Sequence, residues 1–248
     1  MNMMKLLSLA VSILMCMAAN AQIIHIYKGD VLLKVYSVSE ADRVVFPAIN
    51  HEYVDLGLSV KWATCNVGAV NCYDYGDYFA WGETEPYSTF GKPAFNWSTY
   101  KYAVESEKEW KVTKYCTSTS NGTVDNLTTL EAEDDAAHVN WDGSWRIPTD
   151  AELTELRTKC SWTWTNQSGV KGYKITGPNG NTIFLPAGGS HEEEYQANFG
   201  ISGSYWSSSL NIQNSHHAYY LYFDSHDVER NDNGDRRYYG CSIRPVCP

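Results

Sequence analysis

The chain has 248 residues, a formal net charge of −10 and 43% hydrophobic residues, including 9 Trp and 18 Tyr. This acidic balance argues against nucleic acid or an anionic membrane as a partner, because both attract basic surfaces. The apolar content is ample for one sizeable core, so we expect one large domain with a small appendage.

The first 21 residues are typical of a secretory signal peptide. Lys5 precedes an apolar run at residues 6–19, which leads into the small-residue sequence Ala-Asn-Ala. The run is too short to span a membrane as a helix. A lipid anchor at Cys16 is disfavoured because the bulky Met15 precedes it. We therefore expect cleavage before Gln22 and export to the cell surface or the extracellular space.

Residues 22–50 are expected to form a small N-terminal β-hairpin leader. Two apolar runs, at residues 23–27 and 31–36, flank the turn sequence Lys-Gly-Asp, and this pattern is a hairpin signal. A lone hairpin is marginally stable in water, so it should pack on the main domain or pair with another chain. The second alternative makes a pilus or another surface structure a partner for this segment.

The main domain, residues 51–248, is predicted to be α+β. Residues 53–82 alternate strand-like pieces with Gly and Asn turns, whereas residues 83–114 have no clear period and predict an irregular loop. Residues 161–186 predict successive antiparallel strands joined by tight turns. Residues 187–203 form a Gly-rich loop with a His-Glu-Glu-Glu sequence, which either contacts a ligand or is simply exposed.

The clearest helix signal begins at Thr149. Its hydroxyl is a favourable N-cap, and Glu152 follows three residues later to complete a capping box. Leu153 and Leu156 supply an inward-facing stripe, and the helix should end near Cys160.

Clustered carboxylates raise the question of a metal site. Residues 127–139, expected to be a short helix or an ordered loop, contain Glu131, Glu133, Asp134 and Asp135. Such groups can bind a hard cation, but no EF-hand spacing occurs, and a solvated acidic surface is the simpler interpretation. The sequence Asp-Asn-Gly-Asp at residues 232–235 resembles part of a calcium loop, although Asn-Gly favours a turn. The sequence therefore predicts no metal site and no cofactor.

Six cysteines lie outside the expected signal peptide. They are Cys65, Cys72, Cys116, Cys160, Cys241 and Cys247. An even number in an exported chain favours disulfides, although the sequence does not select their connectivity. No Cys-x-x-Cys pair occurs, so a zinc site is disfavoured.

The C-terminal segment is rich in the residues that dominate recognition surfaces. Tyr provides a large contact area with few rotatable bonds, while Asn, His, Asp and Arg provide hydrogen bonds. We therefore predict a ligand-binding surface in this segment. Its candidate residues are Asn211, Asn214, His216, His217, Tyr220, Tyr222, Asp224, His226, Arg230, Asp232, Arg236, Arg237 and Tyr239.

A strand is predicted around residues 220–224, and its geometry determines which side chains face solvent. A strand places successive side chains on opposite faces. Leu221 and Phe223 are therefore expected to face the core, and Tyr220, Tyr222 and Asp224 to face solvent. The alternative hypothesis is a polar edge of a β-rich domain that carries tyrosines without binding a ligand.

Four stretches carry a resemblance to a known family. They are residues 53–68 (YVDLGLSVKWATCNVG), 76–83 (GDYFAWGE), 145–149 (WRIPT) and 203–246, which begins GSYWSSS and ends GCSIRPV. From about Tyr53 to the C-terminus, the chain resembles the FISUMP-type major paralogous domain of secreted bacterial proteins. The resemblance implies a C-type lectin-like fold with short antiparallel strands, few helices and long loops, related to formylglycine-generating enzymes and to the variable proteins of diversity-generating retroelements.

This resemblance also implies a function. In the retroelement-diversified proteins, residues between a YWSSS-like and an SVRPV-like anchor are rewritten, and residues 204–246 look similar. An adhesin or receptor-like module is therefore expected, with an unknown protein or glycan ligand on a host or neighbouring cell. The competing classes are an enzyme related to formylglycine generation and a purely structural surface protein. Residues around Cys241 do not match that enzyme family's active-site pattern, and no catalytic motif occurs, so no enzymatic activity is expected.

Overall fold

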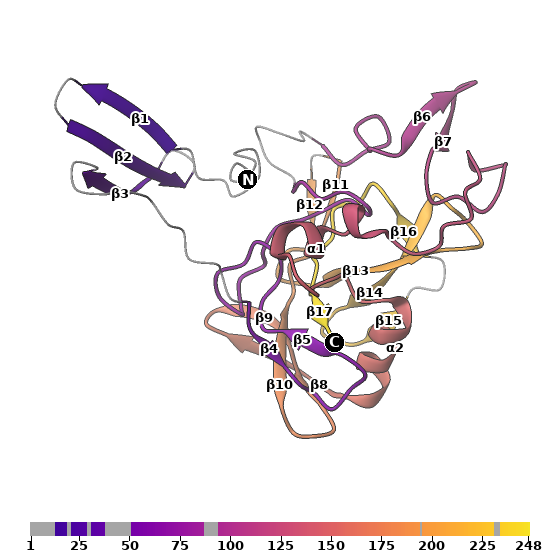
Figure 1. Ribbon diagram of the computed structural model, residues 1–248. Coiled ribbons are helices and arrows are strands. Elements are labelled where there is room, and N and C mark those ends of the chain that lie inside the picture. The colour runs from indigo at the N-terminus through magenta and orange to yellow at the C-terminus, as the bar shows by residue number, and fades with distance from the viewer. Residues whose placement is uncertain are drawn as a thin grey trace. The chain divides into compact units, whose positions relative to one another are not determined.

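The structure is a computed structural model that describes residues 13–18, 21–28, 31–37, 51–86, 94–193, 195–230 and 234–248, the first three segments by their backbone alone. The chain divides into two compact units, Met1–Asn50 and His51–Pro248 (Figure 1).

The N-terminal unit contains three antiparallel strands. They are β1 (Ile13–Ala18), β2 (Ala21–Lys28) and β3 (Val31–Ser37), in the order β1-β2-β3. The expected hairpin corresponds to β2 and β3, which pair antiparallel with each other. β1 lies within the segment expected to be the signal peptide and was not predicted as a strand.

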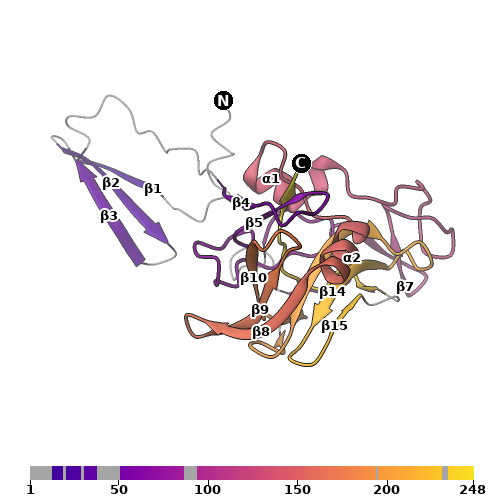
Figure 2. The same ribbon diagram turned by 90° about the horizontal axis from the view of Figure 1, so that it is seen from below.

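A four-stranded antiparallel sheet lies at the centre of the C-terminal unit. β13 (Gly203–Leu210) pairs with β14 (His217–Phe223), and the other edge of β14 pairs with β15 (Val228–Arg230) and β16 (Asp235–Arg236). β16 pairs with the start of β14, and β15 pairs with its end. Figure 2 shows β14 and β15 side by side with α2 nearby.

Shorter sheets complete the unit. Their strands are β4 (Tyr53–Val54), β5 (Lys61–Ala63), β6 (Ala103–Ser106), β7 (Glu109–Val112), β8 (Ser161–Gln167), β9 (Val170–Thr176), β10 (Thr182–Pro186), β11 (Ser190–Glu192), β12 (Tyr195–Ala197) and β17 (Val246–Cys247). The sheets β10-β9-β8 and β17-β5-β4 are antiparallel, as are the pairs β6-β7 and β11-β12. Short antiparallel strands with few helices confirm the α+β class, and β8 to β10 confirm the strands predicted for residues 161–186.

The helix predicted from Thr149 begins where its capping chemistry indicates. In α2 (Asp150–Lys159), the Thr149 hydroxyl accepts a hydrogen bond from the Glu152 backbone, and the Glu152 side chain accepts one from the Thr149 backbone. The acidic segment forms a 3₁₀ turn, η2 (Ala132–Asp134), followed by α1 (Ala136–Trp141). Within the described residues, no helix has the length and apolar character needed to span a membrane.

The prediction of an irregular loop over residues 83–114 is wrong for its last part, because β6 and β7 form a hairpin there. Its turn residues, Glu107 and Lys108, both have positive φ, at 52° and 67°. Two positive φ values are typical of the tight turn that suits a hairpin, but such turns usually contain Asn or Gly. Without those residues, the turn gave no signal in the sequence.

Two hydrophobic cores cover the opposite faces of the central sheet. The first includes Trp206 of β13 and Tyr220 of β14, and the second includes Leu221 and Phe223 of β14. Because adjacent residues of β14 belong to different cores, this strand is buried on both faces. β13 and β14 are therefore interior strands over most of their length, whereas the shorter β15 and β16 are partly exposed.

A buried arginine ties the second core to the C-terminal residues. Arg244 is 1% exposed. Its Nε donates to Asn66 Oδ1 at 2.9 Å, and its two other nitrogens donate to the carbonyls of Ala63, Thr64 and Phe184 at 2.8 to 2.9 Å. These bonds satisfy a charged group that would be costly to bury without partners. The GCSIRPV sequence is thus part of the framework.

The expected disulfides are not formed in the structure, where all six cysteines are free thiols. Cys116 donates to the Ser118 carbonyl at 3.1 Å, and Gln167 donates to Cys72 Sγ at 3.2 Å. Cys241 lies in the first core. Burial raises the pKa of the Cys241 thiol, so it stays protonated. Stability therefore comes from the two cores and their hydrogen bonds.

Candidate functional site

The structure divides the predicted ligand-binding residues between the interior and the surface. Asn211, Tyr220 and Arg237 are 3%, 7% and 0% exposed. The expectation that Tyr220 faces solvent is wrong, and Asn211 and Arg237 belong to the framework. Asp232 lies outside the described residues.

Tyr220 is buried because β14 has no solvent-facing side at this position. Its ring packs edge-on against Trp206, with 5.9 Å between the ring centroids. Leu221 is buried in the second core. Successive side chains of β14 therefore do point to opposite faces, but each face is covered by a core, and Tyr220 points into the first.

Arg237 is buried among aromatic rings that its charge attracts. Its guanidinium carbon lies 4.7 Å from the Trp81 ring centroid, and its Nε donates to the Tyr100 hydroxyl at 2.9 Å. The remaining nitrogens donate to the carbonyls of Lys114, Tyr115 and Ser215 at 3.0 to 3.1 Å. This arginine joins the loop before β14 to the segment after β7.

Five polar side chains from three segments of the chain, β11, β14 and residues 235–239, gather at the end of the sheet where β16 joins β14. We name this set the C-terminal face, and it consists of Glu192, His217, Asp235, Arg236 and Tyr239. His217 pairs with Arg236 across the strands. The Glu192 carboxylate lies close enough to raise the pKa of both Asp235 and Tyr239. Glu192 and Arg236 are exposed, and the other three are partly exposed.

The β11 strand reaches this face through a close backbone approach. His191 and Gly240 exchange backbone hydrogen bonds of 2.8 and 2.9 Å. A Cβ atom at Gly240 would lie 2.5 Å from the Phe95 ring, so only glycine allows this packing. The contact places Glu192 beside residues more than 40 positions later in the chain, which sequence spacing could not indicate.

Arg236 is held by two tyrosines. Its Nη1 donates to the hydroxyls of Tyr238 and Tyr239 at 3.1 and 3.3 Å. The two rings pack edge-on at 4.9 Å, and Tyr238 is buried while Tyr239 is partly exposed. Arg236 therefore presents a positioned positive charge next to an aromatic surface, a combination that is common at binding hot spots.

Asp235 gives the face a titratable group near neutral pH. Burial raises the pKa of Asp235 to about 6, and the nearby Glu192 carboxylate also raises it. The Arg236 backbone N–H, which donates to Asp235 Oδ1 at 2.8 Å, and the charge of His217 act in the opposite direction. The charge of the C-terminal face therefore changes between about pH 5 and pH 7.

Replacing Asp235 with asparagine should make the protein more stable at pH 7 but not at pH 4. Because the pKa in the folded state is above the unfolded value, the folded protein binds the proton more tightly, and this stability is lost as pH rises through about 6. Asp235→Asn should therefore raise the free energy of unfolding by about 2 kcal/mol at pH 7. Urea unfolding at both pH values measures the difference; an equal effect at both would contradict this assignment.

The other predicted residues near the start of β14 are held by contacts within the domain. His216 Nε2 lies 2.9 Å from the Trp110 carbonyl, which can only accept, so Nε2 carries the proton. His216 Nδ1 then accepts from Asn121 at 3.1 Å. Burial lowers the pKa of His216, consistent with a neutral ring. Asn214 Oδ1 accepts from the His216 backbone at 3.1 Å and stabilises the turn before β14.

A second group of predicted residues lies toward the far end of β14. Asp224 Oδ1 accepts from the backbone of His226 at 2.7 Å and of Asp227 at 3.1 Å, so it stabilises the turn between β14 and β15. Tyr222 is partly exposed and packs against the first core. His226 is exposed, and its Nδ1 lies 2.9 Å from the Ser225 hydroxyl.

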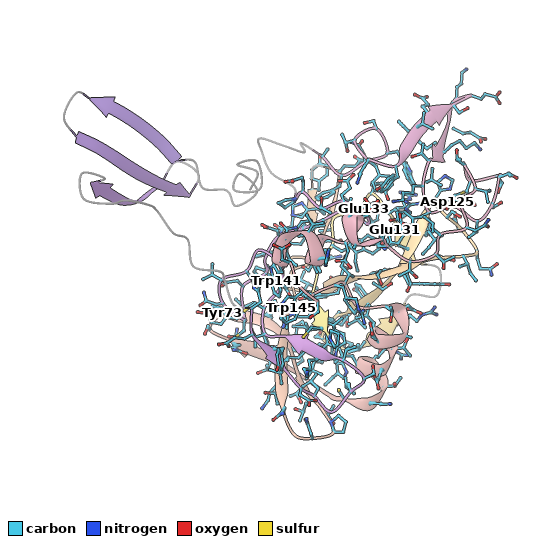
Figure 3. All side chains as sticks on the ribbon, in the orientation of Figure 1. Tyr73, Asp125, Glu131, Glu133, Trp141 and Trp145 are labelled. Atoms are coloured by element: carbon cyan, nitrogen blue, oxygen red, sulfur yellow. The ribbon has the colours of Figure 1, made fainter. Side chains whose placement is uncertain are left out.

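The acidic cluster before α1 is occupied by a lysine ammonium. Glu131, Glu133 and Asp134 lie close enough to bind one cation, and Figure 3 labels the two glutamates. Lys114 Nζ lies 2.6 Å from Glu131, 3.6 Å from Glu133 and 2.7 Å from Asp134. Asp135 caps α1 instead, by accepting from the backbone of the helix's first turn. These groups are therefore satisfied by protein contacts.

Asp134 is the buried centre of that cluster. It accepts hydrogen bonds from the hydroxyls of Tyr102 and Tyr115 and from Lys101 and Lys114. Burial acts to raise the pKa of Asp134, but these four donors outweigh it and hold the pKa well below its usual range. The carboxylate stays charged and joins η2 to the segment around β7.

Comparisons of the chain with family models, curated proteins and solved structures found no match. The interpretation of function therefore depends on the geometry of the C-terminal face and on the sequence resemblance.

Proposed function

We propose that this protein is a secreted or surface-displayed ligand-binding module of C-type lectin-like architecture, and that the C-terminal face is its binding surface. The observation that carries the proposal is the meeting of Glu192 of β11, His217 of β14, Asp235 and Arg236 of β16, and Tyr239 just after β16 at one end of the central sheet. Binding sites are most effective when the supporting side chains are fixed by packing and hydrogen bonds.

The framework beneath the face supports this proposal. Arg237 follows directly after Arg236 and is fully buried, with hydrogen bonds to three carbonyls and one hydroxyl. The YWSSS and SIRPV sequences are also almost entirely buried. The two sequences that resemble the family's anchors are thus part of the framework. Between them along the chain lie four residues of the C-terminal face, His217, Asp235, Arg236 and Tyr239.

The chemistry of the face suits a protein or glycan ligand. Arg236 offers donors, Glu192 and Asp235 offer acceptors, and Tyr239 offers an aromatic ring. Such a mixture of Tyr and Arg with small polar groups resembles a paratope more than a catalytic centre, which needs a fixed nucleophile or acid–base pair. Cys241 lies beneath the face as a buried thiol, and burial raises its pKa, which disfavours nucleophilic catalysis by its sulfur. A retroelement origin for residues 204–246 remains part of the proposal.

An alanine series tests the proposed surface once a ligand is found by screening glycan arrays and displayed surface proteins. One or two of His217→Ala, Arg236→Ala and Tyr239→Ala should each weaken binding about thirtyfold. The matched control is His226→Ala, which removes an exposed histidine from the far end of β14. Affinities equal to that of the unaltered protein across all face variants would reject the surface.

A further inference from the structure

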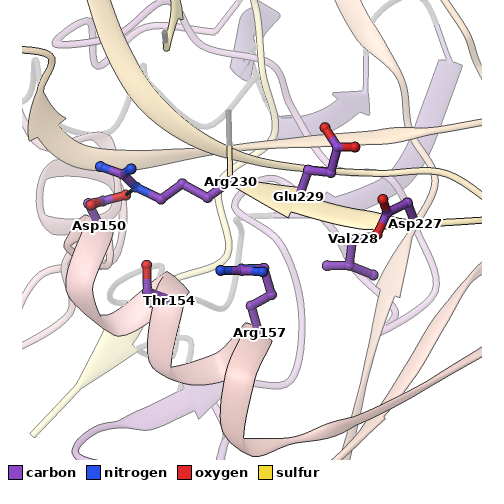
Figure 4. Close-up of a pocket in the computed structure, with 7 residues that line it drawn as sticks. All are labelled: Asp150, Thr154, Arg157, Asp227, Val228, Glu229 and Arg230. Atoms are coloured by element: carbon purple, nitrogen blue, oxygen red, sulfur yellow. Dashed lines mark hydrogen bonds and ion pairs between the residues drawn. The ribbon is translucent and has the colours of Figure 1, made fainter. Parts of the chain in front are cut away.

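A polar groove lies between α2 and β15, away from the C-terminal face. Its volume is about 570 Å³, and Figure 4 shows the residues that line it. β15 pairs with Leu221 to Phe223, whereas β16 pairs with His217 and Ala218 at the other end of β14. The groove is therefore a separate site. Its lining residues are Asp150, Thr154, Arg157, Asp227, Val228, Glu229 and Arg230.

Arg157 supplies the groove with a buried donor. It belongs to the last turn of α2, and its side chain extends toward β15 (Figure 4). Its Nε is buried and has no hydrogen-bond partner among the described residues. Burying such an N–H without an acceptor is unfavourable, and arginine stays charged, so an anionic oxygen is the acceptor that suits it best.

The carboxylate of Asp150, at the start of α2, already accepts a hydrogen bond from Arg230. Asp150 Oδ1 accepts from Arg230 Nε at 2.7 Å, and the Arg230 guanidinium carbon lies 4.2 Å from the Tyr219 ring centroid. These contacts position Arg230 and leave Asp150 turned toward it (Figure 4). Asp150 is therefore not available to Arg157, whose Nε has no acceptor among the described residues of the groove.

The rim sets the rest of the ligand chemistry. Asp227 and Glu229 are exposed on the β15 side, and Thr154 adds a hydroxyl from the helix. These carboxylates accept hydrogen bonds from hydroxyl or ammonium groups. The groove is lined by three carboxylates and two guanidinium groups, and this excess of negative charge disfavours a multiply charged phosphate as the ligand. A ligand with a single carboxylate and neighbouring hydrogen-bond donors fits the groove better.

We propose that this groove binds a small ligand whose carboxylate pairs with Arg157 and whose hydroxyl or ammonium groups contact Asp227 and Glu229. The volume lies within the range of about 300 to 1,000 Å³ that small-molecule sites occupy. Two kinds of molecule carry this chemistry, an acidic monosaccharide and a free α-amino acid. The site is independent of the proposed function of the C-terminal face.

The test is a titration of the full chain with glucuronate, with glutamine, with neutral glucose and with inorganic phosphate. Calorimetry measures affinity, and the NMR signal of the Arg157 Nε–H reports the contact directly. Glucuronate or glutamine should saturate the site and shift that signal, and whichever binds more tightly identifies the source. Glucose and phosphate should bind at least tenfold more weakly.

Variants separate a binding role from a structural one. Arg157→Met should weaken binding of the acid at least tenfold, while Arg157→Lys keeps the charge and should retain part of the affinity. The control, Lys174→Met, removes one positive charge from an exposed position on β9 and should change nothing. Because Arg157 Nε is buried without a partner among the described residues, Arg157→Met should melt at or above the temperature of the unaltered protein.

Three results would overturn the proposal. They are the absence of saturable binding of either acid, equal affinity in the Arg157→Met variant, and an Arg157 Nε–H signal that does not move during titration. The NMR readout uses the unaltered protein, so it decides the question even where a variant fails to fold.

Discussion

Replacing Arg237 with methionine is expected to lower the free energy of unfolding by about 4 kcal/mol. The change removes the donors that satisfy the carbonyls of Lys114, Tyr115 and Ser215 and the hydroxyl of Tyr100. Each buried polar group left without a partner costs about 1 to 3 kcal/mol, and the favourable contact with aromatic rings is also lost. Urea unfolding followed by circular dichroism measures the effect.

The adjacent arginine is the control for this prediction. Arg236 is exposed and its hydrogen bonds are to tyrosine hydroxyls, so Arg236→Met should change the free energy of unfolding by about 0.5 kcal/mol or less. The two variants have the same chemical change at neighbouring positions. Equal destabilisation by both would show that the C-terminal segment is not divided into framework and surface.

Truncating Trp206 to alanine should cost about 4 kcal/mol of stability. The ring is 1% exposed, packs against Tyr220, and donates from Nε1 to the Phe79 carbonyl at 2.9 Å. The change leaves a cavity in the first core and removes one of the two hydrogen bonds that the Phe79 carbonyl accepts, the other coming from the Cys241 backbone. The midpoint of urea unfolding should fall while its slope stays constant.

A half-buried tryptophan provides the comparison. Trp145 packs edge-on against Trp141 at 5.2 Å and is partly exposed, so Trp145→Ala should cost roughly 1 to 2 kcal/mol. Figure 3 shows these two residues close together. A Trp206 variant no less stable than the Trp145 variant would contradict the assignment of Trp206 to the core.

Local chemistry made part of the fold predictable. The capping box at Thr149 and Glu152 and the turns between β8, β9 and β10 depend on neighbouring residues, and the structure confirms both. The β6-β7 hairpin was missed because its turn residues, Glu107 and Lys108, carry no Gly or Asn signal. Local patterns therefore predicted the elements whose geometry is set locally.

Burial in the C-terminal segment could not be predicted in the same way. An alternating strand has the same pattern whether its second face meets water or another core, so Tyr220 was assigned to solvent. Arg236 and Arg237 are chemically identical in the sequence, and only the tertiary position of the Tyr100 hydroxyl and three carbonyls distinguishes them.

The sequence indicated which residue types form the candidate site, but it did not indicate every residue that belongs to it. His217, Arg236 and Tyr239 were among the predicted ligand-binding residues, and they do meet at one end of the sheet. Glu192 reaches the same place only through the backbone contact between His191 and Gly240. A contact between residues so distant in the chain has no signal in a single sequence.

The most direct test of the central claim is the affinity of an Arg236→Ala/Tyr239→Ala double variant for the ligand recovered by screening. We predict a loss of at least about a hundredfold in affinity, with a melting temperature close to that of the unaltered protein. Arg157→Met in the separate groove should bind this ligand normally. Unchanged binding by the double variant, or a loss caused by Arg157→Met instead, would contradict the claim that the C-terminal face is the binding surface.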